Sequence, residues 1–566
     1  MADLASIDPL SWQELEPHYA ALLAEPLTAE TAAGWLQRWS DLEALFVEAI
    51  SATFRAKTEH TADADAEQRY QHLMTVIQPE IEATNQQLKQ KLLSTNYLDA
   101  QPEYHELLRL LRSEAELFHE ANLPLLAEEQ ARSSGYYTIT GGQTVTLDGQ
   151  ELTIPQAEQR LLDLDRDRRE QAWRAIAERR RQDHAGLSAL FLELIALRRR
   201  IAANAECTDY RDYSWRRLKR FDYTPQDSQA LHAAIEAEIV PLAARLAERR
   251  RRLLGIATIR PWDTRVDYAG RAPLRPFTTA AELESGVARM LARIDPELGA
   301  QFERMRNGFL DLGSRKDKAV MGYQTFFPRL GMPYIFMNAV GTQLDIQILL
   351  HEAGHAFHAL AASAGQSLIW YIVDSPIEFR ELASQAMELL ATPYYRREQG
   401  GFYSAEDARR ALHEQLDLVV ASLRNISAND AFQHWVYAEA SPQVTPDELD
   451  AKYRELQQRF FPEEDWSGLD HERGMRWQIG PHAITLPFYM IEYVISRLGS
   501  LQVWRHALAD QQAALRQYRA ALALGGSRPL PELYRTVGAR MAFDRTTIAE
   551  LARLIETQLE LDEPTA

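Results

Sequence analysis

The sequence predicts a mainly α-helical fold with two short β segments. Apolar residues recur three and four positions apart from about residue 10 to 130, and again from Pro155 to about Leu254, which is the spacing of one buried helix face. Two stretches of chain interrupt this spacing, and both have the composition of strands and turns. The first helical stretch contains Trp35, Trp39, Leu42, Leu45 and Phe46.

The first interruption is GYYTITGGQTVTLDGQELTIPQ, residues 135–156, in which Thr, Val and Leu alternate with other residues. Gly141–Gly142 and Asp148–Gly149 are typical of tight hairpin turns. We therefore predict a small β-meander near residues 136–154, inserted in an N-terminal helical lobe. Aromatic residues gather within the next helical stretch, at Tyr210, Tyr213, Trp215 and Tyr223, and favour a domain boundary near residue 205. The predicted domains are thus residues 1–205 and 206–566.

The second interruption is GYQTFFPRLGMPYIFMNAVG, residues 322–341. Tyr334, Ile335 and Phe336 lie in it between Pro333 and Gly341, and their β-branched and aromatic side chains predict a short strand.

Composition excludes several classes of partner. The formal net charge of −19 would repel a phosphate backbone, so we expect no nucleic-acid partner. The single cysteine, Cys207, excludes an intrachain disulfide and fits a reducing compartment. The first 20 residues lack the pattern of a signal peptide, and no segment approaches the roughly 20 apolar residues of a membrane span. We therefore expect a cytoplasmic protein with no membrane partner.

The segment QLDIQILLHEAGHAFHALAA follows the predicted strand and contains the candidate metal-binding and catalytic residues. Its apolar residues predict a largely buried helix. His351 and His355 are four positions apart, so both imidazoles leave the same face and can bind one metal ion. Glu352 is displaced by about 100° around the helix and can reach a water molecule at that metal. This is the H-E-x-x-H arrangement of zinc peptidases.

A catalytic zinc ion usually has three protein ligands, so a third ligand must lie elsewhere. The metzincin pattern fails, because His358 and Ala361 occupy the positions of its Gly and third His. We interpret His358 as a hydrogen-bonding partner in the packing of the helix. The segment DSPIEFRELASQAMELLATP offers three glutamates instead. They are Glu378, Glu381 and Glu388.

Helix capping and burial separate these candidates. Ser375, Pro376 and Glu378 have the form of a helix start with a capping box, which gives Glu378 a structural role. Glu381 lies one turn further, among apolar residues where an unpaired carboxylate would be costly to bury, and is the best third ligand. Glu388 is two turns beyond Glu381 and could accept a hydrogen bond from a ligating imidazole.

HEAGHAFH followed by FRELASQAMELL resembles the zinc site of the thimet-oligopeptidase family, and the details are most similar to its oligoendopeptidase F branch. The likeness covers nearly the whole chain. It implies a two-lobed helical shell around a deep substrate channel, with a zincin-type core and its peptidase region in residues 206–566. It also implies one Zn²⁺ per chain, bound by His351, His355 and Glu381, with Glu352 as general base.

Further roles follow from the resemblance alone. WQIGPHAITLPFYMIEYVIS is similar to the family's late His and Tyr segment, which implies that His482, with Tyr489 or Tyr493, stabilises the oxyanion. PYIFMNAVGT is similar to its substrate-flanking strand. Tyr334, Phe336 and Asn338 are therefore predicted to bind substrate, the strand pairing with the peptide main chain.

The function that we predict is zinc-dependent endopeptidase hydrolysis of short unfolded oligopeptides. Two alternatives remain open at this point. A peptide-binding shell that has lost catalysis would keep the fold but not the full set of His351, Glu352, His355 and Glu381, and all four are present. A zinc hydrolase of non-peptide amides would share the same metal site.

Overall fold

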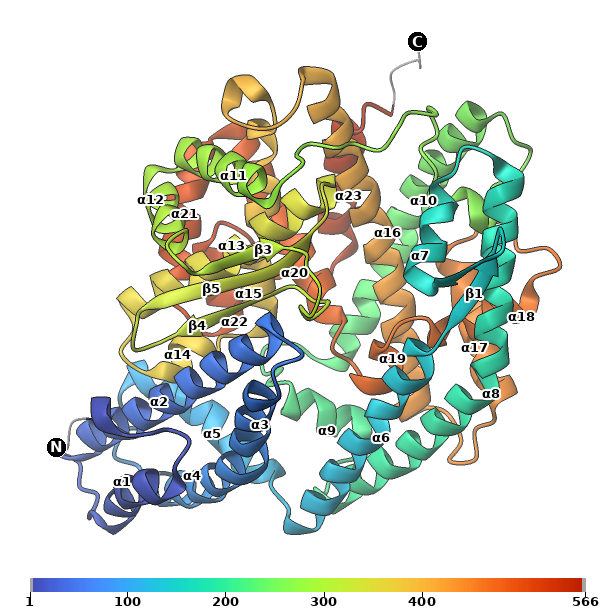
Figure 1. Ribbon diagram of the computed structural model, residues 1–566. Coiled ribbons are helices and arrows are strands. Elements are labelled where there is room, and N and C mark those ends of the chain that lie inside the picture. The colour runs from blue at the N-terminus through green and yellow to red at the C-terminus, as the bar shows by residue number, and fades with distance from the viewer. Residues whose placement is uncertain (1–3, 562–566) are drawn as a thin grey trace. The chain divides into compact units, whose positions relative to one another are not determined.

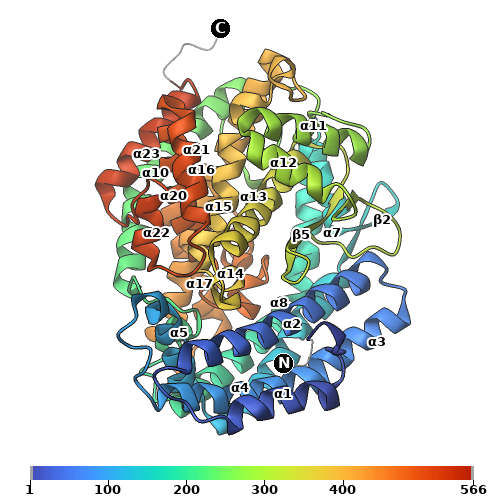
Figure 2. The same ribbon diagram turned by 90° about the vertical axis from the view of Figure 1, so that its left-hand side faces the viewer.

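The computed structural model describes residues 4–561, and most of them are helical (Figure 1; Figure 2). The predicted mainly α-helical fold with small sheets is confirmed. Internal contacts divide the chain into two units. The first unit comprises the residues up to Glu116, Leu274–Leu412 and Ile495–Met541, and the second comprises Leu117–Pro273, His413–Val494 and the residues from Ala542 on. Residue 205, near which we predicted a boundary, lies within the second unit.

The first unit contains a three-stranded sheet and the helices that precede and follow it in sequence. Its strands are β3 (Leu310–Gly313), β4 (Tyr323–Phe327) and β5 (Met332–Ala339). Its helices are α1 (Trp12–Ala24), α2 (Ala32–Glu59), α3 (Ala64–His72), α4 (Gln78–Leu93), α5 (His105–Leu117), α11 (Ala280–Ile294), α12 (Pro296–Met305), α13 (Gln343–Gly365), α14 (Ile369–Val373), α15 (Ile377–Leu390), α21 (Gln511–Leu522) and α22 (Leu530–Thr536).

The second unit contains a hairpin and several long helices. The hairpin strands are β1 (Thr144–Leu147) and β2 (Gln150–Thr153). The helices are α6 (Leu123–Gly141), α7 (Ile154–Glu158), α8 (Arg166–Asn204), α9 (Tyr210–Arg217), α10 (Pro225–Leu254), α17 (Pro446–Phe460), α18 (Asp470–Gly474), α19 (His482–Thr485) and α23 (Arg545–Gln558). Two further helices are divided between the units, namely α16 (Ala405–Ala438) and α20 (Ile491–Ala509), and the last residue of α5, Leu117, also belongs to the second unit.

The residues outside the description are 1–3 and 562–566, and the first three begin the segment for which we expected no signal peptide. Within residues 4–561, no helix combines the length and the apolar composition needed to cross a membrane.

The N-terminal helices bury the residues on which their periodicity was recognised. Trp35, Trp39, Leu42 and Leu45 are buried in one apolar cluster, with Phe46 packed at its margin. The cluster also includes Leu368, which directly precedes α14, and Tyr371, which lies within α14. The chain on either side of α14 is thereby anchored to the N-terminal helices.

The inserted β segment is shorter than predicted. Residues 136–141 continue helix α6, and only β1 and β2 form, so the element is a two-stranded hairpin rather than a meander. Its single turn is Asp148–Gly149, where both residues have positive φ, 52° and 75°. That backbone matches a type I′ turn, which suits the twist of a hairpin and favours Asp-Gly. Gly141–Gly142 ends α6 instead of turning a strand.

The sheet of the first unit has the order β3-β5-β4, so that β5 is its central strand. β5 pairs in parallel with β3 and antiparallel with β4, and helix α13 follows it directly. The predicted strand is confirmed, but its predicted role in pairing with substrate is wrong over its central residues. Ile335 and Phe336 have partners on both sides, so their main chain has no free edge to offer a peptide.

The predicted substrate contacts of Tyr334 and Phe336 fail as well, because both side chains are fully buried. The Tyr334 hydroxyl donates to Glu59 Oε1 at 2.7 Å, and the Phe336 ring stacks on Tyr323 with 5.0 Å between the ring centroids. Asn338 is partly exposed, and its side-chain amide donates to the carbonyl oxygens of Ala319 and Met321. These side chains stabilise the sheet, and a role of Asn338 toward substrate stays a prediction.

A buried lysine links two strands of this sheet through hydrogen bonds. The Lys318 ammonium donates to Asp311 Oδ1 at 2.8 Å, to the Gly313 carbonyl at 2.8 Å and to the Met337 carbonyl at 2.6 Å. Its side chain is fully buried, and burial lowers the pKa of Lys318, with the nearby Asp311 carboxylate opposing that shift. Because Asp311 and Gly313 belong to β3 and Met337 to β5, this one cation links two strands.

Lys318→Met should lower the free energy of unfolding by about 3 kcal/mol, because Asp311 and two buried carbonyl oxygens lose their shared donor. Chemical denaturation measures the loss. Lys316→Met is the control, since Lys316 is exposed and should change stability by less than about 0.5 kcal/mol. Equal stability of the two variants would contradict the bracing role of Lys318.

Candidate metal centre

The helix that carries the H-E-x-x-H motif is α13, and a capping box fixes where it begins. Asp345 Oδ2 accepts hydrogen bonds from the backbone N–H of Thr342 at 2.7 Å and of Val340 at 3.0 Å. Gly341, between them, has a φ of 92°, which a residue with a side chain adopts only with strain. The turn from β5 into α13 is therefore fixed, and so is the direction in which the motif residues project.

His351 and His355 project from adjacent turns of α13 toward Glu381 on α15. His351 Nε2 lies 3.4 Å from Glu381 Oε2, and His355 Nε2 lies 3.8 Å from Glu381 Oε1. One ligand atom from each residue lies within 4.8 Å of the other two, so the three can hold one metal ion. The structure thus brings together the three residues that the sequence selected as ligands.

The helices α13 and α15 can approach so closely because of Gly354. A Cβ atom at this position would lie 2.5 Å from the Ser384 Cα atom and 2.8 Å from the Ala383 carbonyl oxygen, which are backbone atoms that cannot rotate away. Ala353, Ala383 and Ser384 are also fully buried. Small residues on both helices therefore set the distance across which the histidines meet Glu381.

Glu388 orients one of the histidines. Its Oε1 lies 2.8 Å from His351 Nδ1, and its Oε2 lies 3.2 Å from Arg497 Nη1 in α20. A carboxylate at Nδ1 holds the proton there, so that Nε2 is the ring nitrogen directed at Glu381 and the metal position. This is the contact that the spacing of Glu388 predicts. The sequence analysis did not predict the contribution of Arg497. A single arginine within the largely apolar stretch IEYVISRLGS indicates a buried residue with an acidic partner, and this signal could have identified it.

The charge balance of the cluster favours a cation between the three groups. Burial opposes ionisation of Glu381, but the neighbouring histidines outweigh it and lower the pKa of that carboxyl to about 2. Burial lowers the pKa of His355 to about 4, so its imidazole is neutral at pH 7 and offers a lone pair. Burial also opposes protonation of His351, yet hydrogen bonds to Glu381 and Glu388 raise its pKa to about 10.

These two imidazoles and one carboxylate fit a catalytic zinc ion, which commonly takes three such ligands and leaves a position open. The cluster attracts positive charge, and a divalent cation supplies it. Nitrogen donors in this number favour zinc over magnesium or calcium, which prefer oxygen ligands.

Glu352 lies on α13 next to His351 and is 8% exposed. Burial raises the pKa of its carboxyl to about 7, and the negative charges of Glu381 and Glu388 add to the shift. A carboxyl with a pKa near neutrality can take up a proton and release it again, which a general base needs.

Two further sequence predictions in this region have different outcomes. His358 is buried and packs with its ring edge-on against Phe379, at 5.2 Å between centroids, but its Nε2 has no hydrogen-bond partner among residues 4–561, so the predicted hydrogen bond is not found at that atom. The predicted capping box at Ser375 is wrong, because α15 begins at Ile377 with Pro376 as its N-cap and no side-chain cap. Glu378 is buried in the first turn of α15 and is not part of the metal-ligating cluster.

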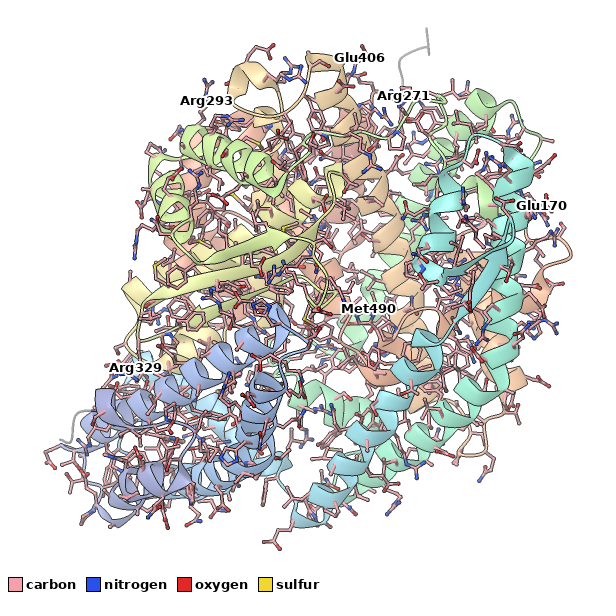
Figure 3. All side chains as sticks on the ribbon, in the orientation of Figure 1. Glu170, Arg271, Arg293, Arg329, Glu406 and Met490 are labelled. Carbon is pink, nitrogen blue, oxygen red and sulfur yellow. The ribbon has the colours of Figure 1, made fainter. Side chains whose placement is uncertain are left out.

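The late His and Tyr segment belongs to the second unit. His482 begins α19 and stacks on Tyr489 with 6.5 Å between ring centroids, and the Tyr493 hydroxyl lies 3.5 Å from that of Tyr489. Met490, labelled in Figure 3, lies between the two tyrosines in sequence. The three side chains form one half-buried group. Their predicted role in catalysis stays a prediction.

The backbone of this segment is strained and firmly held. Phe488, just before Tyr489, has a φ of 65°, which is rare for a bulky residue. Its carbonyl accepts from Arg220, which also pairs with Glu492 at 2.9 Å in a fully buried ion pair. The sequence analysis missed Arg220 and Glu492. A glutamate among the apolar residues of IEYVIS was the signal that could have found the pair.

A buried H-E-x-x-H helix packed on a helix that supplies a glutamate is the arrangement of a metallopeptidase. The sequence profile of peptidase family M3 matches residues 161–553, which is more than half of the chain. The chain belongs to peptidase family M3, and its fold is that of a peptidase. A comparison with curated proteins finds no match.

Solved structures support the same assignment over almost the whole chain. A structure described as oligoendopeptidase F is 26% identical, with a TM-score of 0.87 over 98% of this chain and 97% of the other. PZ peptidase A with a bound inhibitor is 25% identical, with a TM-score of 0.87 over 98% of each chain. A protein from Bacillus anthracis, also described as an oligoendopeptidase F, shares the fold at 22% identity, with a TM-score of 0.83 over 99% and 98% of the two chains.

Gly354→Ala should push α13 and α15 apart and lower both stability, by about 1–3 kcal/mol, and metal affinity. Isothermal titration with Zn²⁺ and thermal unfolding measure the two effects. Gly186→Ala in α8 is the matched control, because nothing lies within 4 Å of a Cβ placed there, and it should leave both quantities unchanged or slightly raise stability. Unaltered metal affinity in Gly354→Ala would show that the helix separation does not control the site.

Proposed function

We propose that this peptidase is a zinc-dependent endopeptidase that hydrolyses short unfolded peptides. The observation that carries the proposal is the meeting of His351, His355 and Glu381 beside the buried carboxyl of Glu352. Membership of peptidase family M3 supports hydrolysis of peptide bonds, and the inhibitor-bound PZ peptidase A shares the fold. The lone Cys207 and the absence of any membrane-crossing helix in residues 4–561 are compatible with the cytoplasmic location that we propose.

His351, His355 and Glu381 are the groups that hold the zinc ion in this proposal. When bound, zinc supplies a Lewis acid that polarises a carbonyl group and acidifies water. Glu388 keeps the Nδ1 proton of His351 in place, and Arg497 holds the second oxygen of Glu388. Three donor atoms are thereby presented together: Nε2 of the neutral His355, a carboxylate oxygen of Glu381, and Nε2 of His351, where a bound metal ion would take the place of the proton that the raised pKa of His351 retains.

Glu352 is the proposed general base. Its carboxylate takes a proton from the attacking water and later delivers that proton to the nitrogen of the departing amine, so the same carboxyl is regenerated in each turnover. A pKa raised by burial to about 7 places the group where both transfers are easy at neutral pH. His482, with Tyr489 or Tyr493, is proposed to donate hydrogen bonds to the developing oxyanion.

Glu352→Gln should lower the rate of peptide hydrolysis by about 10²–10⁴-fold, because an amide of the same size cannot accept the proton of water. Zinc content and peptide affinity should persist, since neither depends on that transfer. A quenched fluorescent peptide measures the rate, and metal analysis measures the zinc. Hydrolysis near the original rate would contradict the assignment, and loss of zinc would make Glu352 a ligand or a structural group.

Glu381→Ala should weaken zinc binding and abolish hydrolysis, whereas Glu378→Ala should lower stability and leave the zinc in place. The pair is closely matched, because both residues are buried glutamates in the first two turns of α15. Metal analysis and thermal unfolding of the two variants distinguish the roles, and chelation of the unaltered protein should reproduce the loss of activity. The reverse result would show that the wrong glutamate was chosen.

A further inference from the structure

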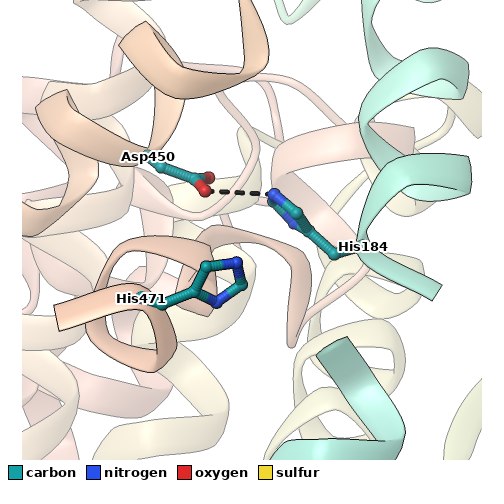
Figure 4. Close-up of side chains that lie close together, drawn as sticks. All are labelled: His184, Asp450 and His471. Carbon is teal, nitrogen blue, oxygen red and sulfur yellow. Dashed lines mark ion pairs between the residues drawn. The ribbon is translucent and has the colours of Figure 1, made fainter. Parts of the chain in front are cut away.

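We propose that the second unit contains a further metal site, formed by His184, Asp450 and His471, for a divalent transition-metal ion such as Zn²⁺ (Figure 4). His184 projects from α8, Asp450 from α17 and His471 from α18. His184 Nε2 lies 3.0 Å from Asp450 Oδ2, and the rings of the two histidines are 5.3 Å apart between centroids. One nitrogen or oxygen atom of each residue lies within 4.8 Å of the other two.

The tautomer of His184 is determined by Gln478. The Gln478 side-chain amide nitrogen donates to the backbone carbonyl of His184 at 3.2 Å and to Ser188 Oγ at 2.9 Å. Because a carbonyl oxygen only accepts, the amide cannot be reversed, and Gln478 Oε1 is the atom that lies 3.1 Å from His184 Nδ1. Nδ1 must therefore carry a hydrogen and donate it to Gln478.

This leaves Nε2 as the lone-pair atom of a neutral His184, and it is Nε2 that faces the carboxylate. A lone pair 3.0 Å from a carboxylate oxygen is repulsive unless a cation, either a proton or a metal ion, lies between them. A metal ion satisfies both atoms at once.

The Asp450 carboxylate is also oriented by a buried hydrogen-bond partner. Asp450 Oδ1 accepts a hydrogen bond from the indole N–H of Trp477 at 2.8 Å, and Trp477 is fully buried. Oδ2 is thus left to face His184. Each of the two inner donors therefore has a buried partner that fixes the atom it presents, and such partners are characteristic of metal sites. Trp477 and Gln478 are adjacent in the sequence, so one short segment supports both donors.

His471 differs from the other two donors because it is exposed, at the first turn of α18. Its ring lies beside the pair in Figure 4 and completes a set of two imidazoles and one carboxylate. Such a set favours zinc, cobalt, nickel or copper over magnesium and calcium. A metal ion held here joins α8 to the segment of α17 and α18, so that its binding stabilises the second unit.

Zn²⁺ titration of the full chain, carrying His351→Ala and His355→Ala and no added histidine tag, tests this site independently of the proposed catalytic one. We expect this variant to bind one Zn²⁺ per chain at micromolar metal and to unfold at a higher temperature with the metal present. Adding His471→Ala should abolish the binding, and His471 is exposed, so the change removes no buried packing. Adding Gln478→Ala should weaken the binding by about 10–100-fold.

His119→Ala is the matched control, since His119 is another exposed histidine of the second unit and is outside the cluster. It should leave the binding intact. No Zn²⁺ bound by the His351→Ala, His355→Ala variant, or binding that survives His471→Ala, would overturn the proposal and leave a histidine–aspartate ion pair. Neither result would affect the proposed peptidase function, because Glu352→Gln tests that separately.

Discussion

The close approach of α13 and α15 is the constraint on which the candidate active site depends. The backbones meet where Gly354 faces Ser384, and a single methyl group there would overlap main-chain atoms. At this separation, two histidines from one helix and a glutamate from the other each place a ligand atom within 4.8 Å of the other two. Protein interiors are packed too densely for the helices to move apart and leave a gap. The geometry of the ligands is thus set by Gly354 and Ser384, which are neither metal ligands nor catalytic groups in this proposal.

A series of ion pairs links this pair of helices to α20. Glu381 contacts His351, His351 contacts Glu388, and Glu388 contacts Arg497. All of these groups are largely buried, and a buried charge without a partner is costly, so each contact restricts the next. Arg497 is the last residue of this series, and through Glu388 it orients the His351 imidazole without contacting it.

The sequence predicted well those features that depend on local spacing. His351, His355 and Glu352 lie within five residues of one helix, so their relative directions follow from helix geometry alone. Glu381 and Glu388 were found by their positions in a second amphipathic helix, and the structure places both beside His351. Trp35 and Trp39 followed from the same periodicity and are fully buried.

Features that depend on distant parts of the chain were not predictable in this way. The strand Met332–Ala339 was recognised, but its position in the centre of the sheet depends on β3, whose residues pair with it across a sequence separation of 25 or 26, which periodicity does not reveal. Lys318 resembles a loop lysine in the sequence, but its side chain is fully buried, with its ammonium surrounded by four acceptor atoms from Asp311, Gly313 and Met337. Ser375 failed as a cap because the following Pro376 took the N-cap position.

The compact spacing of the metal-ligating groups has a consequence for how the protein is made. His351, His355, Glu381 and the orienting Glu388 all lie within 38 consecutive residues, so the connection that must close to bring them together is short and its entropy cost is small. Arg497, in contrast, lies more than 100 residues further along the chain. A ribosome that has released the chain only as far as α15 has already delivered every donor atom of the site. Metal capture therefore need not wait for the C-terminal third of the protein, and an ion bound at that stage would favour the native pairing of α13 with α15 while later helices are still being synthesised.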